Sequence, residues 1–467
     1  MQNFWDYSVW SFLNLIAVLL LSLLVANTLK RKIPFLKASL IPTSVLGGLI
    51  LIIISASYKA VNKQEFFETA FFGGNGIAAM ETITYHALAL GFIASTFRPT
   101  GGKLSKKRTT EIVNTGMTTV ATYLMQGILG LIISVIAVKF VPSFCAGAGI
   151  LLPFGYGQGT GQAMNYGNIF ETQFGFEGGK SFGLTIAALG FISASAGGVI
   201  YLNVLRRKGK IKDIVKRNEG PLLSEQIQGE NEIPMNESMD KLTVQMALIF
   251  AAYLLTYFIM RGLASLIPGL KSVVYGFNFL FGVLSATIIK GLLNFLKKKG
   301  VMKREYTNAF LMARTSNFFF DIMVVAGIAA IRLDLLKNYW GIIVIMGIVG
   351  LVSTYAYNYF VAKLLFPEYV QEQFLVMYGM LTGTASTGVI LLREIDEEFK
   401  TPAADNLVYQ NFPAIILGFP MMIFATLAPD RPWMVIFITL AYFIVLNIAL
   451  FRSFIFKPKK SAGEEKK

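Results

Sequence analysis

The chain has 467 residues, of which 54% are hydrophobic, with a mean hydropathy of +0.58 and a formal net charge of +15. It is far more apolar than a soluble domain, and many of its apolar runs reach the roughly 20 residues that a membrane-spanning helix needs. The excess basic residues lie in short loops between apolar runs, which is typical of membrane topology signals and argues against a nucleic-acid-binding surface. With one cysteine and one histidine, the chain forms no intramolecular disulfide, and a structural zinc, a haem or a histidine-based catalytic site is not expected.

The first half of the chain contains five apolar runs long enough to cross a bilayer. They cover residues 9–29, 40–57, 77–97, 117–138 and 182–205. The first run is too long for a cleaved signal sequence and no basic segment precedes it, so we expect a spanning helix. Basic loops follow the first and third runs, whereas the loop before the third run has balanced charge. This alternation predicts an N-terminus outside the cell and a cytoplasmic C-terminus.

A polar stretch at 207–240, rich in Lys, Glu, Asn and Gln, predicts a cytoplasmic linker with little packed structure. Beyond it the plan repeats, with apolar runs at 242–267, 273–295, 307–331, 340–366 and 409–427. Because an odd number of spans turns the second half over, we predict an inverted repeat with halves at 1–206 and 241–429. The segment 430–467 adds one more apolar run and a basic tail. The predicted fold is an all-α polytopic membrane protein, with two five-helix halves and an extra C-terminal helix.

Each half also contains a glycine-rich stretch that is too short to span a bilayer. In 151–167, glycine occupies every second position from Gly155 to Gly161, and each glycine costs a regular helix roughly 1 kcal/mol relative to alanine. Non-helical backbone at membrane depth is tolerated only where it is packed in protein or lines a wet cavity, so we predict a re-entrant hairpin at about 144–167. A related stretch predicts a second hairpin at about 372–395. In an inverted repeat the two hairpins enter from opposite faces and their tips approach the midplane.

The two tips are the candidate substrate site. Glycine-rich backbone offers N–H groups that an anion can approach closely, while unwound carbonyls and hydroxyl groups suit sodium. The candidate substrate-binding residues are Gly157, Gln158, Gly159, Thr160, Gly161, Gln162, Asn165, Thr382, Gly383, Thr384, Ser386 and Thr387. The alternative is that the glycines only let helices pack closely, as small residues do in any membrane bundle.

Polar residues inside the spans are costly and therefore functional candidates. Asn317 and Asp321 lie one helical turn apart and share a face. We add Asn317 to the candidate substrate residues. The candidate sodium ligands are Thr160, Ser316, Asp321 and Thr384. The alternative for Asp321 is a structural ion pair with an arginine. His86 either carries protons or is satisfied by a neighbouring carbonyl or hydroxyl, and Gln126 is a weaker candidate.

Three stretches of the chain are similar to segments of a known protein family. They are Phe35-Leu-Lys-Ala-Ser-Leu-Ile-Pro-Thr-Ser-Val-Leu-Gly-Gly48, the first tip with Gly157-Gln-Gly-Thr-Gly161, and the second tip with Gly383 and Thr387. Together they resemble the bacterial glutamate:sodium symporter (ESS) family, whose first hairpin carries a Gly-Gly-x-Gly-x-Gly signature. Tyr156 stands where that signature has a glycine. The resemblance runs, with gaps, from the first helix to the tenth.

The resemblance implies coupling to Na⁺, a homodimer in the bacterial inner membrane, and an alternating-access motion of a core carrying the hairpins against a dimer scaffold. We therefore expect a sodium-coupled symporter of glutamate or a related small organic anion or amino acid, and not an enzyme. The alternatives are an ion or solute channel, which would need a continuous polar path or charged rings, and a proton-coupled carboxylate transporter. The sequence contains no phosphate-binding loop of an ATP-driven pump.

Overall fold

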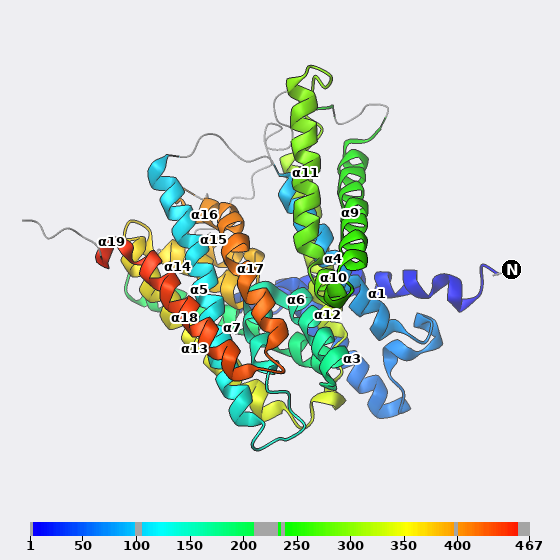
Figure 1. Cartoon of the computed structure of the whole chain (residues 1–467). Helices are drawn as coiled ribbons and strands as arrows, with labels where there is room; N and C mark the ends of the chain where they lie inside the picture. The colour runs from blue at the N-terminus through cyan, green and yellow to red at the C-terminus, as the bar shows by residue number, and fades with distance from the viewer. Residues whose placement is uncertain (1–2, 99–104, 210–231, 235–238, 397–399, 456–467) are drawn as a thin grey trace, which may run out of the picture.

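The computed structural model describes residues 3–98, 105–209, 232–234, 239–396 and 400–455 (Figure 1). The described residues form helices joined by short connections, with one isolated β-bridge between Glu232 and Glu305 and no strand. Ten of these helices are long and apolar enough to cross a bilayer, and a bent pair adds an eleventh if it is counted as one span. The predicted all-helical character is confirmed, and the apolar helices agree with a polytopic membrane protein.

The helices before the linker are α1 (Tyr7–Lys32), α2 (Pro34–Ala38), α3 (Thr43–Asn62), α4 (Gly76–Phe97), α5 (Lys106–Ala137), α6 (Leu151–Phe174) and α7 (Gly179–Arg207). Those after it are α9 (Lys241–Leu266), α10 (Lys271–Gly276), α11 (Asn278–Lys298), α12 (Ala309–Ala329), α13 (Trp340–Leu365), α14 (Val370–Thr382), α15 (Ala385–Arg393), α16 (Ala403–Tyr409), α17 (Asn411–Leu427), α18 (Pro432–Leu450) and α19 (Arg452–Ile455). Short 3₁₀ turns join several of them, including η5 (Leu333–Leu336) between α12 and α13. Most of the predicted linker, and the basic tail beyond residue 455, lie outside the described residues.

The chain breaks or bends near the start of two predicted spans. The apolar run at 273–295 is divided into α10 and α11 at Phe277, and α17 is preceded by α16 at an angle of 49°. The second interruption has a direct cause, because Pro413 has no N–H to donate to the Tyr409 carbonyl one turn earlier. Hydropathy averages over such breaks, so the apolar pattern could not show them.

The helices gather into two lobes (Figure 1). One lobe, which we call the hairpin lobe, contains α5–α7 and α13–α19; the other, the scaffold lobe, contains α1–α4 and α9–α12. In the hairpin lobe α5 packs on α13, α17 and α18, and in the scaffold lobe α4 packs on α11 and α12. The lobes meet mainly where α6 packs against α4, α10 and α12.

Helix α5 runs the length of the hairpin lobe and defines two ends of the molecule. Near its start, Lys107 Nζ lies 2.7 Å from Glu368 Oε1, and we call this the Lys106 end. At its other end, which we call the Ala137 end, four aromatic rings pack together: Phe144, Phe176, Phe182 and Tyr339. Phe144 precedes α6, Phe176 follows α6, Phe182 belongs to α7 and Tyr339 precedes α13. The cluster therefore places both ends of α6, the start of α7 and the start of α13 at the Ala137 end.

Helix α6 folds back on itself at Gly159, and we call it hairpin 1. Gly159 has a φ of +79° and a ψ of −167°, far from helical values. The rings of Phe154 and Tyr166 stack with their centroids 4.0 Å apart, whereas a straight helix would separate their Cα atoms by about 18 Å. Phe144 precedes α6 and Phe176 follows it, so both ends of hairpin 1 lie at the Ala137 end.

Helices α14 and α15 also lie side by side, and we call the pair hairpin 2. A Cβ atom on Gly379 would lie 2.8 Å from the Cα of Gly388, nine positions further along the chain. Glu368 precedes the pair at the Lys106 end, and Glu394 follows it and faces Arg206 at 3.6 Å. The two hairpins therefore reach the middle of their lobe from opposite ends.

The limbs of the hairpins differ in part from the predicted bounds. Hairpin 1 occupies Leu151–Phe174, later in the chain than the predicted 144–167, because the aromatic cluster holds the preceding segment in turns at the Ala137 end. Hairpin 2 spans 370–393, close to the predicted 372–395.

Candidate binding site at the two hairpin tips

The tips of the two hairpins touch one another. A Cβ atom on Gly159 would lie 3.3 Å from Thr384 Cγ2, and a Cβ atom on Gly190 of α7 would lie 2.5 Å from the Thr382 carbonyl oxygen. Only glycine gives the φ of Gly159 without strain, and only glycine at position 190 lets the second tip come so close to α7. Two segments more than 200 positions apart in the sequence thus form one structure.

Helix α5 holds both tips. The Tyr123 hydroxyl donates to the Gly157 carbonyl at 3.0 Å, and Gln126 Nε2 donates to the Leu381 carbonyl at 2.9 Å. Each of these carbonyls lies in the last turn of the limb that enters the tip, where helical carbonyls have no partner of their own. Two side chains one turn apart on α5 therefore cap the two entering limbs.

The structure places the first-tip candidates between the lobes. Thr160 is buried, and its hydroxyl lies 3.3 Å from the Met323 carbonyl of α12. Asn165 Nδ2 donates to Gln162 Oε1 at 2.8 Å and lies 3.3 Å from the carbonyl of Gly276, at the end of α10. Gly157, Gly159 and Gly161 are buried as well, and Gln158 is half-buried.

The second-tip candidates are partly open. The Thr382 hydroxyl donates back to the Tyr378 carbonyl at 2.6 Å, so it caps its own helix. The hydroxyl oxygens of Thr384 and Thr387 lie 3.4 Å apart across the turn. Thr382, Gly383 and Thr387 are buried, Thr384 is half-buried and Ser386 is exposed.

The candidates on α12 point to other partners. The Ser316 hydroxyl donates to the Gly91 carbonyl of α4 at 2.9 Å. Ser44 of α3 faces the Asp321 carboxylate, and no ion pair of Asp321 is resolved among the described residues. Asn317 and Asp321 are both exposed, one turn apart as the spacing predicts. Of the predicted sodium ligands, Thr160 and Thr384 lie at the hairpin tips. Ser316 instead bonds to α4, and Asp321 faces α3.

Sequence reasoning missed three residues that line the tips. The Phe191 ring would lie 3.2 Å from a Cβ on Gly383 and 3.9 Å from one on Gly159, and Met323 lies against Gly159 and Gly161. Tyr123 is the third. Phe191 and Met323 are apolar, and nothing in the sequence distinguishes an apolar side chain beside a tip from one in the core. Tyr123 could have been predicted as a candidate, because its hydroxyl lies inside a span and needs a partner.

No protein-family model matches the chain, and no curated protein matches it.

The four helix ends at the tips can bind groups of both charges. The returning limbs begin at Thr160 and Ala385, where the first N–H groups of a helix point outward and favour an anion. Thr384 precedes α15 without forming a side-chain cap. The entering limbs end at the Gly157 and Leu381 carbonyls, which favour a cation. This arrangement suits a small anion or zwitterion together with a monovalent cation.

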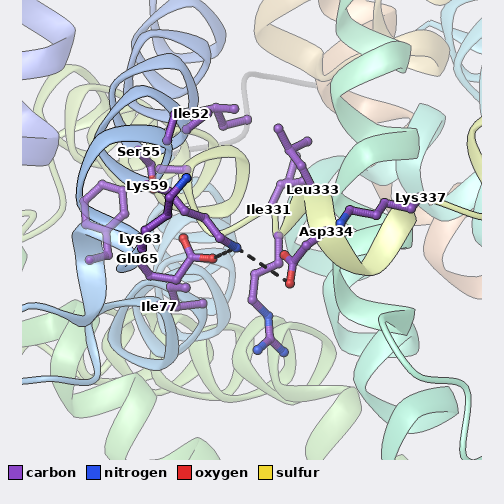
Figure 2. A pocket seen from close by; sticks show the side chains of 15 residues that line it. Ile52, Ser55, Lys59, Lys63, Glu65, Ile77, Ile331, Leu333, Asp334 and Lys337 are labelled. Carbon is purple, nitrogen blue, oxygen red and sulfur yellow. Dashed lines mark hydrogen bonds and ion pairs between the residues drawn. The ribbon is translucent and has the colours of Figure 1, made fainter.

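The two ends of the molecule are closed to different degrees. At the Ala137 end, Lys180 of α7 lies 2.7 Å from Glu81 of α4, and this ion pair joins the two lobes. Lys59 of α3 lies between Glu65 and Asp334, with 3.8 Å to the latter, in a cavity of about 470 Å³ (Figure 2). None of the residues lining this cavity belongs to either tip.

The Asp334 connection also joins the lobes. Asp334 lies in η5, which is attached to α7 because the Arg332 N–H donates to Ser181 Oγ at 3.1 Å. Among the described residues of the Lys106 end, the ion pairs that are resolved stay within one lobe, for example Lys107–Glu368 and Arg206–Glu394. The resolved ion pairs that join the lobes thus lie at the Ala137 end, whereas Leu40 of the scaffold lobe packs against the apolar cluster of Tyr201 and Leu391 in the hairpin lobe.

Proposed function

We propose that the protein is a sodium-coupled secondary active transporter that carries glutamate or a related small organic anion or amino acid across the bacterial inner membrane. The observation that carries this proposal is the contact between two hairpin tips that enter one lobe from opposite ends, at Gly159 and Thr384. Transporters with inverted repeats place their substrate and ion sites where broken helices meet near the midplane.

An inverted repeat with re-entrant hairpins is supported by matching contacts in the two halves. Helix α3 packs on α12 as α11 packs on α4, and α1 packs on α3 as α9 packs on α11. Gly48 of α3 comes close to Ile328 of α12, and Gly282 of α11 comes close to Ile93 of α4. At the start of the same helices, Ser44 faces Asp321 of α12, and Asn278 Nδ2 donates to the Tyr85 carbonyl of α4 at 2.9 Å. With the basic loops in the cytoplasm, the Lys106 end is cytoplasmic and the Ala137 end and the N-terminus are outside.

Alternating access is supported by the unequal burial of the tips. Hairpin 1 packs between the lobes against α4, α10 and α12, whereas α14 and α15 pack chiefly within the hairpin lobe. Ser386 at the second tip is exposed while Gly159 and Thr160 at the first tip are buried. We assign the structure to a state that is closed outside and open to the cytoplasm. Movement of the hairpin lobe along the scaffold lobe would convert this state into one that is open outside and closed to the cytoplasm. In this proposal the scaffold lobe also forms the homodimer contact.

The tip residues have distinct roles in this proposal. The amides of Gly159 and Gly161 and the free N–H groups at the start of α15 bind the anionic group of the substrate. The hydroxyls of Thr160 and Thr384 supply oxygen ligands to Na⁺. Asp321 and Asn317 lie on the scaffold lobe, where they meet the second tip as the lobes move.

The test is uptake by purified protein in liposomes. Radiolabelled glutamate, aspartate and dicarboxylates are offered with an inward Na⁺ gradient, with a proton gradient alone, and with neither. We expect uptake that requires the Na⁺ gradient. Uptake driven by protons alone would indicate a proton-coupled carboxylate transporter, and flux that is indifferent to any second ion would indicate a channel.

A further inference from the structure

Behind the second tip, a buried polar network joins α5 to α13. Gln126 Nε2 donates to Thr354 Oγ1 at 2.7 Å as well as to the Leu381 carbonyl at 2.9 Å. Asn358 Nδ2 donates to the Thr354 carbonyl at 3.0 Å and lies 3.3 Å from Thr122 Oγ1. Gln126, Thr354 and Thr122 are 0% exposed and Asn358 is 2% exposed. The network is therefore sealed from solvent and from lipid.

Two amide oxygens of this network have no partner. They are Gln126 Oε1 and Asn358 Oδ1. The orientation of each amide is defined, because each nitrogen faces a backbone carbonyl, Leu381 or Thr354, which can only accept a hydrogen bond. A buried polar atom without a partner destabilises the folded protein, and native proteins leave few of them. Both side chains bond to Thr354, Gln126 to its hydroxyl and Asn358 to its carbonyl, so the two unpaired oxygens belong to one buried network that could take a bound group.

The surroundings favour a cation. Both unpaired atoms are acceptors, and the negative ends of two helices point at the same part of α5, through the Gly157 carbonyl at Tyr123 and the Leu381 carbonyl at Gln126. The network contains amides and hydroxyls and no carboxylate. Neutral oxygen ligands beside helix carboxyl ends suit a monovalent hard cation better than a divalent ion, which usually takes carboxylates.

We propose that Gln126 Oε1 and Asn358 Oδ1 are ligands of a Na⁺ ion bound between α5, α13 and the second tip. The ion stabilises the end of α14 and so couples its own binding to the shape of the tip. The role of this ion in coupling rests on the proposed function. Binding of Na⁺ at the site does not, and it is therefore measured without any substrate.

The experiment uses the purified full-length protein and Na⁺ alone as the probe. Equilibrium binding of ²²Na⁺ and the increase in melting temperature on replacing choline with Na⁺ are measured for wild type and variants. We expect Gln126→Met to lower Na⁺ affinity by about tenfold or more, as loss of ligand support does at metal sites. The matched control is Asn447→Met, because Asn447 is a half-buried amide whose nitrogen and oxygen both have partners. The Na⁺ affinity of this control variant should equal that of wild type.

Asn358→Asp gives a second test with the opposite sign. It keeps the size of the side chain and adds a negative charge facing the Thr354 carbonyl, so the variant should depend on Na⁺ more than wild type and show a larger melting-temperature difference between Na⁺ and choline. If water and not Na⁺ satisfies the two oxygens, both variants will shift melting equally in the two salts, and that result overturns the inference.

The outcomes separate this inference from the proposed function. Na⁺-driven uptake with unchanged Na⁺ affinity in Gln126→Met would refute the site and leave the transporter standing. Absence of both ²²Na⁺ binding and Na⁺-driven uptake in wild type would refute the transporter and the site together.

Discussion

The ion pair between Glu81 and Lys180 should control how often the outer side opens. It joins α4 of the scaffold lobe to α7 of the hairpin lobe at 2.7 Å, with side chains 16% and 19% exposed. In Glu81→Gln, Lys180 keeps Glu171, whose carboxylate lies 3.8 Å from Lys180 Nζ and accepts from the Lys180 N–H at 3.2 Å. The substitution therefore removes the contact between the lobes without leaving an unpaired lysine.

A charge-assisted hydrogen bond in a largely buried place contributes about 1–2 kcal/mol. Because the outward-open state lacks this contact in either protein, the loss falls on the closed state alone and raises the minor outward-open population by a factor of about 5–30. The reporter is Gln162→Cys, a buried position on hairpin 1 next to Asn165, which contacts the end of α10. The background is Cys145→Ser, which removes the native thiol. The labelling rate of the reporter by a membrane-impermeant maleimide added outside should rise by the same factor.

Glu171→Gln is the matched control, since it removes a carboxylate that faces the same lysine from within the hairpin lobe. Its labelling rate should stay at that of the background protein. Equal increases in both single variants, or no increase in Glu81→Gln, would refute the idea that this pair holds the outer side closed.

Three further substitutions test the tips and the packing of the halves. Gly159→Ala forces a side chain into a backbone region that costs about 1–3 kcal/mol, so uptake should fall about tenfold or more, whereas Gly175→Ala, also at positive φ but with open space around it, should transport nearly normally in the same liposome assay. Thr384→Val should raise the Na⁺ concentration for half-maximal uptake by roughly three- to tenfold through loss of one hydroxyl ligand, while Thr172→Val, an exposed hydroxyl at the end of α6, should not; equal values in the two variants would exclude Thr384 from the ion site. Gly48→Ala places a Cβ 2.6 Å from Ile328 Cβ and should lower the free energy of unfolding by about 1–3 kcal/mol, measured by thermal unfolding. Gly282→Ala should lower it less, because the nearest atom to its Cβ lies at 3.0 Å. Gly291→Ala, with nothing within 4 Å of its Cβ, should be neutral or stabilising.

The spanning helices could be predicted because each needs an uninterrupted apolar run, and such runs are visible in the sequence. The same averaging hid the break at Phe277 and the bend before α17, where one missing N–H at Pro413 changes the path of the chain without changing hydropathy. Glycine spacing indicated where the backbone leaves the helix, and Gly159 does so. The spacing did not show where the two helices of hairpin 1 begin and end, so the expected segment 144–167 lies earlier in the chain than α6, Leu151–Phe174.

Partners of polar side chains were harder to predict than the tips themselves. Asn317 and Asp321 share a face as their spacing requires, but Ser316 bonds to α4 and Asp321 faces Ser44 of α3, because the neighbours of α12 are set by tertiary packing. Gln126 was a weak candidate in the sequence and caps the second tip in the structure. His86 is satisfied by the Tyr253 hydroxyl at 2.5 Å, one of the two alternatives open from the sequence.

The most direct measurement of one-sided access is labelling of Ser386→Cys from each side of the membrane. In the Cys145→Ser background, a membrane-impermeant maleimide is applied to right-side-out and inside-out vesicles, with choline, with Na⁺, and with Na⁺ plus the transported substrate. Ser386 is exposed at the second tip, and the proposed state is open to the cytoplasm, so we predict labelling from the cytoplasmic side only, and protection when Na⁺ and substrate are both present. Labelling at equal rates from both sides, or labelling that neither Na⁺ nor substrate changes, would contradict a site formed by the two tips and opened to one side at a time.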